Sequence, residues 1–182
     1  EPIFAAHGVT IARETALELF GTLESEIEHG AYVNYKTVQW HVLEGFGRRL
    51  GFTPSEAELA AFSTSVRDWQ PFPDSPAALQ ALQKKYKLVV VSNVDDDLFA
   101  YSQQKLGVTF DDVITAQQVQ SYKPATPHFH EAFRRIGLPR EQILHVAQSL
   151  FHDIATAKSL GLATVWVNRR RALLKARLLP PM

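Results

Sequence analysis

Hydrophobic and polar positions follow a helical period through the N-terminal part of the chain. Between residues 10 and 29, hydrophobic side chains recur at roughly helical spacing opposite a row of glutamates, which predicts an amphipathic helix that ends at Gly30. A second helix is expected over residues 38–50, followed by Gly51. A third is expected over residues 53–66, because it opens with a capping residue, a proline and early acids.

A cluster of turn-forming residues interrupts this helical pattern. The sequence Pro71-Phe72-Pro73-Asp74 cannot continue a helix, and we place a domain junction between residues 73 and 74. Residues 1–73 are therefore predicted to form a helical segment, in which residues 1–8 end a preceding helix.

From residue 74 onward, short hydrophobic runs rich in β-branched residues alternate with helical segments. This alternation is typical of an α/β fold with a Rossmann-like parallel sheet that is buried on both faces. We therefore predict a core domain over residues 74–182. The expected strands are 87–93, 112–115, 143–147 and 163–167, and the expected helices are 75–86, 96–106, 127–136 and 153–160. The basic tail from Arg169 to Arg177 is interpreted as a solvated terminal helix.

Charge and cysteine content exclude several classes of function. Lysine plus arginine equal aspartate plus glutamate at 19 each among the 182 residues, so no overall field favours nucleic acid or an acidic membrane surface. The chain has no cysteine, which excludes disulfides, thiolate catalysis and cysteine-ligated metals, and which fits a cytoplasmic location. No hydrophobic run approaches the length of a membrane span.

Polar side chains follow the predicted strands at the points where each strand ends. Ser92 and Asn93 end the first strand, Tyr122 and Lys123 lie in the loop that follows the second, and Ser149 and Asp153 follow the third. In an open parallel sheet, ligands bind beyond the carboxyl ends of the strands. The hydroxyl of Ser92, the ammonium of Lys123 and the carboxylate of Asp153 are therefore expected to converge and to hold a small anionic substrate.

The order and context of these residues resemble the haloacid-dehalogenase superfamily. Its second motif is matched by Ser92 at the end of an apolar strand, its third by Lys123 in Ser121-Tyr122-Lys123-Pro124, and its fourth by residues 146–153, which end at Asp153. The segment 86–170 is especially similar to type II 2-haloacid dehalogenases. The resemblance implies that residues 1–73 are the α-helical cap that such proteins insert after their first motif.

The resemblance also implies roles for individual residues. In the family, an aspartate in a D-x-x-G-T pattern on the central strand attacks the substrate and forms an ester, which water then hydrolyses. Ser92 would bind the anionic oxygens of the substrate, Lys123 would neutralise charge near the nucleophile, and Asp153 would orient the lysine or bind Mg²⁺. Asn93, Ser149 and Tyr122 would contact the substrate.

The first family motif is absent from residues 1–182. We therefore expect the chain to lack the central strand and its nucleophile, and to be inactive in this form. The lost strand would expose the edges of its neighbours.

Three functions remain open at this stage. A metal-free 2-haloacid dehalogenase is favoured, although Phe129 and Leu150 stand where dehalogenases carry a tyrosine and an asparagine. A Mg²⁺-dependent phosphatase is the first alternative, but Ser149 stands where such enzymes usually have a second acid. The second alternative is a binding or regulatory protein that has lost catalysis. No cofactor is expected for a dehalogenase, and the expected partners are a 2-haloacid or phosphate ester and a second copy of the chain in a homodimer, with no nucleic acid and no membrane.

Other polar groups have simpler explanations. The acids Asp95, Asp96 and Asp97 are interpreted as solvated residues at a helix start rather than as a metal site, and His128 and His130 are unsuited to binding one metal together.

Overall fold

The computed structural model of the protein describes residues 2–169, and the tail predicted beyond Arg169 lies outside them. The chain divides into two compact units, Glu1–Tyr122 and Lys123–Met182. The domain boundary predicted between residues 73 and 74 falls inside the first unit and stays a prediction. No helix among residues 2–169 is both long and hydrophobic enough to cross a lipid bilayer.

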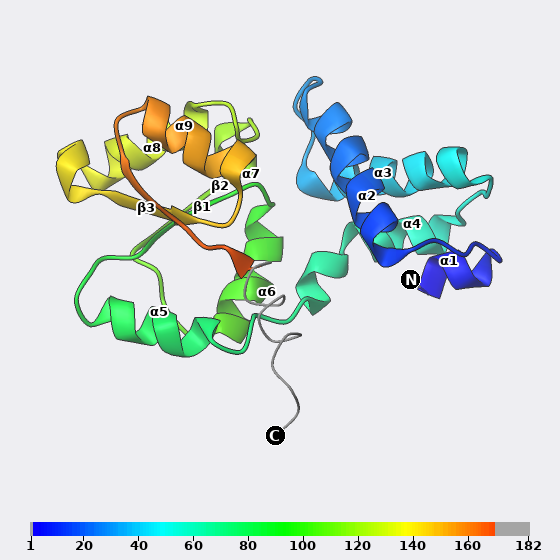
Figure 1. Ribbon diagram of the computed structural model, residues 1–182, viewed down its shortest axis with the longest axis horizontal. Helices are drawn as coiled ribbons and strands as arrows, with labels where there is room; N and C mark the ends of the chain where they lie inside the picture. The colour runs from blue at the N-terminus through cyan, green and yellow to red at the C-terminus, as the bar shows by residue number, and fades with distance from the viewer. Residues whose placement is uncertain (1, 170–182) are drawn as a thin grey trace. The chain divides into compact units, whose positions relative to one another are not determined.

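The first unit begins with helices that pack through hydrophobic side chains. In Figure 1 they run from blue to cyan, with α3 lying against α2 and α4. Their shared core contains Leu23, Val38, Val42, Leu43 and Phe46, all at most 5% exposed. The elements are α1 (Pro2–Ala6), α2 (Arg13–Glu28), α3 (Tyr35–Leu50), α4 (Glu56–Ser63) and the 3₁₀ turn η1 (Ser65–Asp68).

Local capping explains most of these helix boundaries. Gly51 ends α3 with a φ of 79°, as expected for a left-handed cap. The third helix begins one turn later than Thr53, because Ser55 and Glu58 form a reciprocal capping box. The prediction that Gly30 caps α2 is wrong, since His29 caps this helix in a right-handed conformation.

The rest of the first unit is a parallel pair of strands with helices. The strands pair in register, with Val89 opposite Asp112 and Ser92 opposite Thr115. The predicted bounds of α6 and β2 are confirmed. The elements are α5 (Ser75–Gln83), β1 (Val89–Ser92), α6 (Asp96–Leu106), β2 (Asp112–Thr115) and α7 (Ala116–Val119).

The second unit contains the other pair of parallel strands. β3 and β4 pair from Leu144 opposite Ala163 to Ala147 opposite Trp166, and the unit has a small hydrophobic core of Phe129, Ala157 and Leu162. The helix predicted over 153–160 is instead a π-helical turn followed by a short α-helix. The elements are α8 (Pro127–Ile136), η2 (Arg140–Gln142), β3 (Leu144–Ala147), η3 (Leu150–Ile154), α9 (Ala155–Ser159) and β4 (Ala163–Trp166).

The expectation of a sheet buried on both faces is wrong for this second pair. Leu144, Val146 and Val165 are 57%, 53% and 45% exposed, whereas the alternate residue His145 packs against Phe129 of α8. Successive residues of a strand point to opposite faces, so α8 covers one face and leaves the hydrophobic residues of the other face open.

Candidate functional site

A buried ion pair joins the predicted third and fourth motifs. The Nζ of Lys123 donates to the Oδ1 of Asp153 over 2.7 Å, and each side chain is less than 10% exposed. Lys123 begins the second unit with a cis peptide bond to Pro124, and Asp153 lies in η3, shortly after the carboxyl end of β3. The structure thus brings these two predicted site residues into direct contact, while their catalytic role stays a prediction.

A histidine that we did not predict completes this cluster. The Nε2 of His145 lies 3.1 Å from the same Oδ1 of Asp153. Because a carboxylate only accepts hydrogen bonds, Nε2 must carry the proton in this contact. In the sequence, His145 is a single polar residue inside the hydrophobic run Leu144-His145-Val146. Its hydrophobic neighbours indicate a strand but give no sign that the histidine contacts another residue.

These contacts control the ionisation of Asp153. Burial alone would raise its pKa, but the hydrogen bonds from His145 and Lys123, together with their charges, hold the pKa of this carboxyl below its usual value. Asp153 is therefore an ionised carboxylate over the physiological range, and it holds a positively charged lysine within the second unit.

Ser149 has a local structural partner. Its Oγ accepts a hydrogen bond from the backbone N–H of His152 over 3.0 Å and lies 3.1 Å from the Nδ1 of the same residue. These contacts cap the π-helical turn that carries Asp153. Substrate binding by Ser149 stays a prediction.

The remaining predicted site residues belong to the first unit. Ser92 and Asn93 are half-buried at the carboxyl end of β1. Tyr122 is 6% exposed, and its hydroxyl donates to the carbonyl oxygen of Val33 over 2.8 Å. Burial raises the pKa of this hydroxyl. The convergence of these residues with Lys123 and Asp153 is still a prediction.

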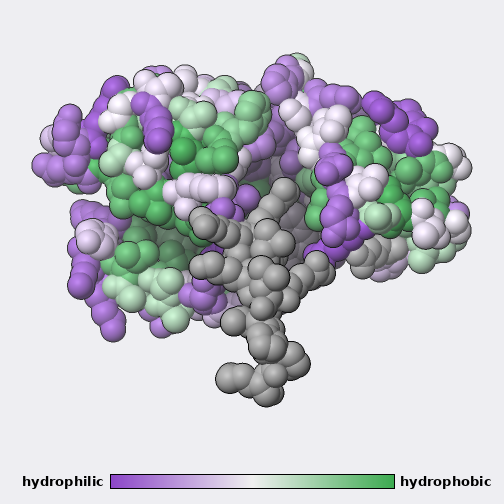
Figure 2. Space-filling view, in the orientation of Figure 1, coloured by the Kyte–Doolittle hydropathy of each residue, from purple (hydrophilic) through white to green (hydrophobic). Residues whose placement is uncertain are grey.

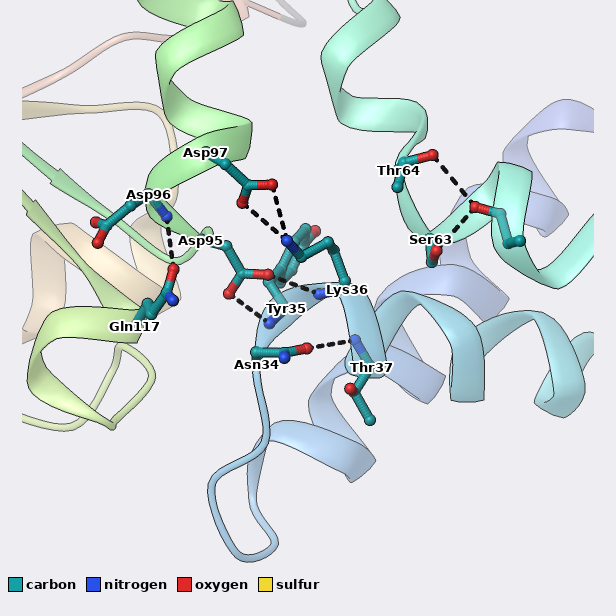
Figure 3. Close-up of polar contacts among 11 residues, drawn as sticks. Asn34, Tyr35, Lys36, Thr37, Ser63, Thr64, Asp95, Asp96, Asp97 and Gln117 are labelled. Atoms are coloured by element: carbon teal, nitrogen blue, oxygen red, sulfur yellow. Dashed lines mark hydrogen bonds and ion pairs between the residues drawn. The ribbon is translucent and has the colours of Figure 1, made fainter.

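Among the acids at the start of α6, Asp95 differs from our expectation, whereas Asp96 and Asp97 are exposed as predicted. Asp95 is completely buried rather than solvated, and its carboxylate binds the start of α3, as Figure 3 shows. Asp97 binds Lys36, and Asp96 accepts from the hydroxyl of Thr115 over 2.6 Å. Each acid thus has its own protein partner, and no group of three or more histidines and acids able to hold a metal occurs within residues 2–169.

A hydrophobic pocket lies elsewhere in the first unit. It measures about 570 Å³ and is formed by α1 to α4 and their connections, and the predicted site residues do not line it. Figure 2 shows hydrophobic residues on the visible surface of these helices. Phe4, Phe20, Phe46 and Phe62 are among the lining side chains, and Arg13 is the charged residue among them.

Two pairs of parallel strands that alternate with helices form an α/β fold, and a buried lysine–aspartate pair lies near the carboxyl end of β3. The family model described as haloacid dehalogenase-like hydrolase matches residues 15–167. The chain therefore belongs to the haloacid dehalogenase-like hydrolases.

Individual relatives indicate which members the chain resembles. An (S)-2-haloacid dehalogenase of Pseudomonas fluorescens is 26% identical over 176 residues, which cover 93% of this chain and 76% of the relative. A glyceraldehyde 3-phosphate phosphatase of Methanothermobacter thermautotrophicus is 33% identical over 102 residues, 54% of this chain and 45% of the relative. The structure of L-2-haloacid dehalogenase from Xanthobacter autotrophicus matches with a TM-score of 0.76 at 23% identity, over 92% of this chain and 73% of that one, and establishes the fold.

Proposed function

We propose that the protein is built to hydrolyse the carbon–halogen bond of small 2-haloacids. In this proposal, an aspartate of the family's first motif attacks carbon 2 and displaces halide, and water then cleaves the resulting ester to release a 2-hydroxy acid and regenerate the carboxylate. Residues 1–182 contain no D-x-x-G-T pattern. The proposal therefore applies to a chain that also carries this motif.

The observation that supports this proposal is the buried contact between Lys123 and Asp153. The ionised Asp153 accepts a hydrogen bond from the Nζ of Lys123, and a buried ammonium attracts both the carboxylate of a 2-haloacid and the attacking aspartate. His145 contributes a further hydrogen bond to Asp153, which orients the carboxylate toward the lysine.

The residues around Asp153 favour this reaction over Mg²⁺-dependent phosphate hydrolysis. A hard divalent cation prefers several carboxylate oxygens. Here, Asp153 already has Lys123 and His145 as partners, and the position four residues earlier is Ser149. The phosphatase remains the second candidate, because a glyceraldehyde 3-phosphate phosphatase is among the relatives.

Several further properties follow as part of this proposal. The N-terminal helices would serve as the cap over the substrate, the dehalogenase would need no cofactor, and a phosphatase would use Mg²⁺ through Asp153. We also propose a cytoplasmic location and a homodimer.

The test restores the first motif and compares two reactions. The chain is extended at its N-terminus with a strand bearing D-x-x-G-T and incubated with L-2-chloropropionate or with p-nitrophenyl phosphate, with and without Mg²⁺. We expect chloride release that needs no Mg²⁺ and that is lost when the added aspartate is asparagine or when Lys123 is changed to methionine. Mg²⁺-dependent phosphate release would support the phosphatase, and neither product would support a binding or regulatory protein.

A further inference from the structure

Asp95 has the most completely buried carboxylate among the described residues of the first unit. It follows Ser92 and Asn93 in the loop after β1, and its side chain is 0% exposed. Its Oδ1 accepts from the backbone N–H of Tyr35 over 2.8 Å, and its Oδ2 accepts from the backbone N–H of Lys36 over 3.0 Å. Figure 3 shows both contacts, which join segments about 60 positions apart in the sequence.

These contacts complete the N-terminus of α3. The first turn of a helix leaves backbone N–H groups without partners inside the helix. Asn34 accepts from the N–H of Thr37 over 2.9 Å, so Asn34 and Asp95 together bind the N–H groups of the first three residues of α3. The negative charge of Asp95 also opposes the positive end of the helix dipole.

The same loop is anchored on its other side to the end of β2. The backbone N–H of Asp96 donates to the Oε1 of Gln117 over 2.9 Å, and its carboxylate accepts from Thr115 and from Gln118. The carbonyl of Val33, just before α3, accepts from Tyr122, the residue that precedes Lys123. The loop that directly follows Ser92 at the end of β1 is therefore held between α3 and the residues around the end of β2.

We propose that Asp95 is a positioning residue for the candidate site, which fixes α3 on the loop that carries Asn93 and directly follows Ser92. The effect of Asp95 on substrate binding rests on the proposed dehalogenase function, but its effect on the structure of α3 and the loop does not. The loss of its carboxylate should release the start of α3 and the loop after Ser92 together, because one side chain connects both.

Asp97 provides a matched control. It lies in the same helical turn and also contacts this part of α3, but its carboxylate is 57% exposed and binds the side chain of Lys36 rather than the backbone. Exposed ion pairs contribute little to stability, so Asp97→Ala should leave both segments nearly unchanged.

The experiment measures amide hydrogen exchange by NMR on the full chain carrying Asp95→Ala, Asp95→Asn or Asp97→Ala. In Asp95→Ala, we expect exchange at Tyr35, Lys36 and Asn93 to accelerate at least about tenfold. Asp95→Asn should recover part of the protection, since its carbonyl still accepts one N–H, and it serves as the test if Asp95→Ala does not fold. Asp97→Ala should change these rates less than about threefold.

Titration with L-2-chloropropionate then separates the two proposals. If the wild-type chain binds this acid, Asp95→Ala should weaken binding more than Asp97→Ala does. If a chain that also carries the D-x-x-G-T strand does not bind it either, the proposed substrate is wrong, while the exchange rates still decide the role of Asp95. Faster exchange at Tyr35 and Lys36 with no change at Asn93 would overturn the positioning role and leave Asp95 as a helix cap alone.

Discussion

The Nζ of Lys123 lies 2.7 Å from the Oδ1 of Asp153, and both residues are 7% exposed. Two charges removed from water in this way depend on each other, because each would otherwise remain buried without compensation. This dependence has a measurable consequence for stability.

Removing one partner should cost more than removing both. Lys123→Met or Asp153→Asn alone should lower the free energy of unfolding by about 3–5 kcal/mol, whereas the double variant should lose less than the sum. Urea denaturation of the wild type and the three variants gives the coupling energy. Additive losses would show that the contact contributes no coupling.

The contribution of Asp153 should depend on pH. Its pKa in the folded protein is lowered from about 3.9 in an unfolded chain, so the folded state favours the ionised form. This stabilisation is fully present above the unfolded pKa and is lost as pH falls through the lower folded pKa. The difference in unfolding free energy between the wild type and Asp153→Asn should therefore be largest near pH 6 and shrink below about pH 4. A difference that stays constant down to pH 3 would contradict this assignment.

His145 should act on Asp153 through its hydrogen bond rather than through its ring packing. His145→Phe keeps an aromatic ring beside Phe129, whose centroid is 5.2 Å away, but removes the donor. The pKa of Asp153, followed by its side-chain carboxyl ¹³C shift, should rise in His145→Phe. His145→Gln, which retains an N–H donor, should reverse part of this rise. Equal titration midpoints in all three proteins would mean that the contact is not a functional hydrogen bond.

Two glycines of α3 should respond differently to the same substitution. A Cβ at Gly47 would lie 2.5 Å from the backbone oxygen of Phe52, which cannot easily move, whereas a Cβ at Gly45 would meet the flexible end of Leu23 at 2.8 Å. Gly47→Ala should therefore lower the free energy of unfolding by about 1–3 kcal/mol. Gly45→Ala should change it by less than about 1 kcal/mol, because alanine's better helix propensity offsets the contact. Urea denaturation measures both, and a smaller loss for Gly47→Ala would refute the packing argument.

Much of the fold was predictable because it depends on local order in the chain. The bounds of α6, β2 and α8 follow from hydrophobic periodicity and from the residues that start and end a helix, and the structure has them where they were predicted. The motifs at the ends of β1 and β3 are local in the same sense. They were sufficient to indicate the family to which the chain belongs.

Long-range contacts decided the rest. Asp95, Asp96 and Asp97 look equivalent in sequence, yet Asp95 is buried only because the start of α3 comes to it from 60 positions away. In the sequence, His145 looks like any other strand residue, and only the folded structure shows that Asp153 lies beside it. The hydrophobic face of β3 was expected to be buried, but in the structure it is exposed. Sequence determines which residues can form helices, strands and caps, since those choices depend on near neighbours. Tertiary structure determines which charges are removed from water and what compensates them, since that depends on packing between distant segments.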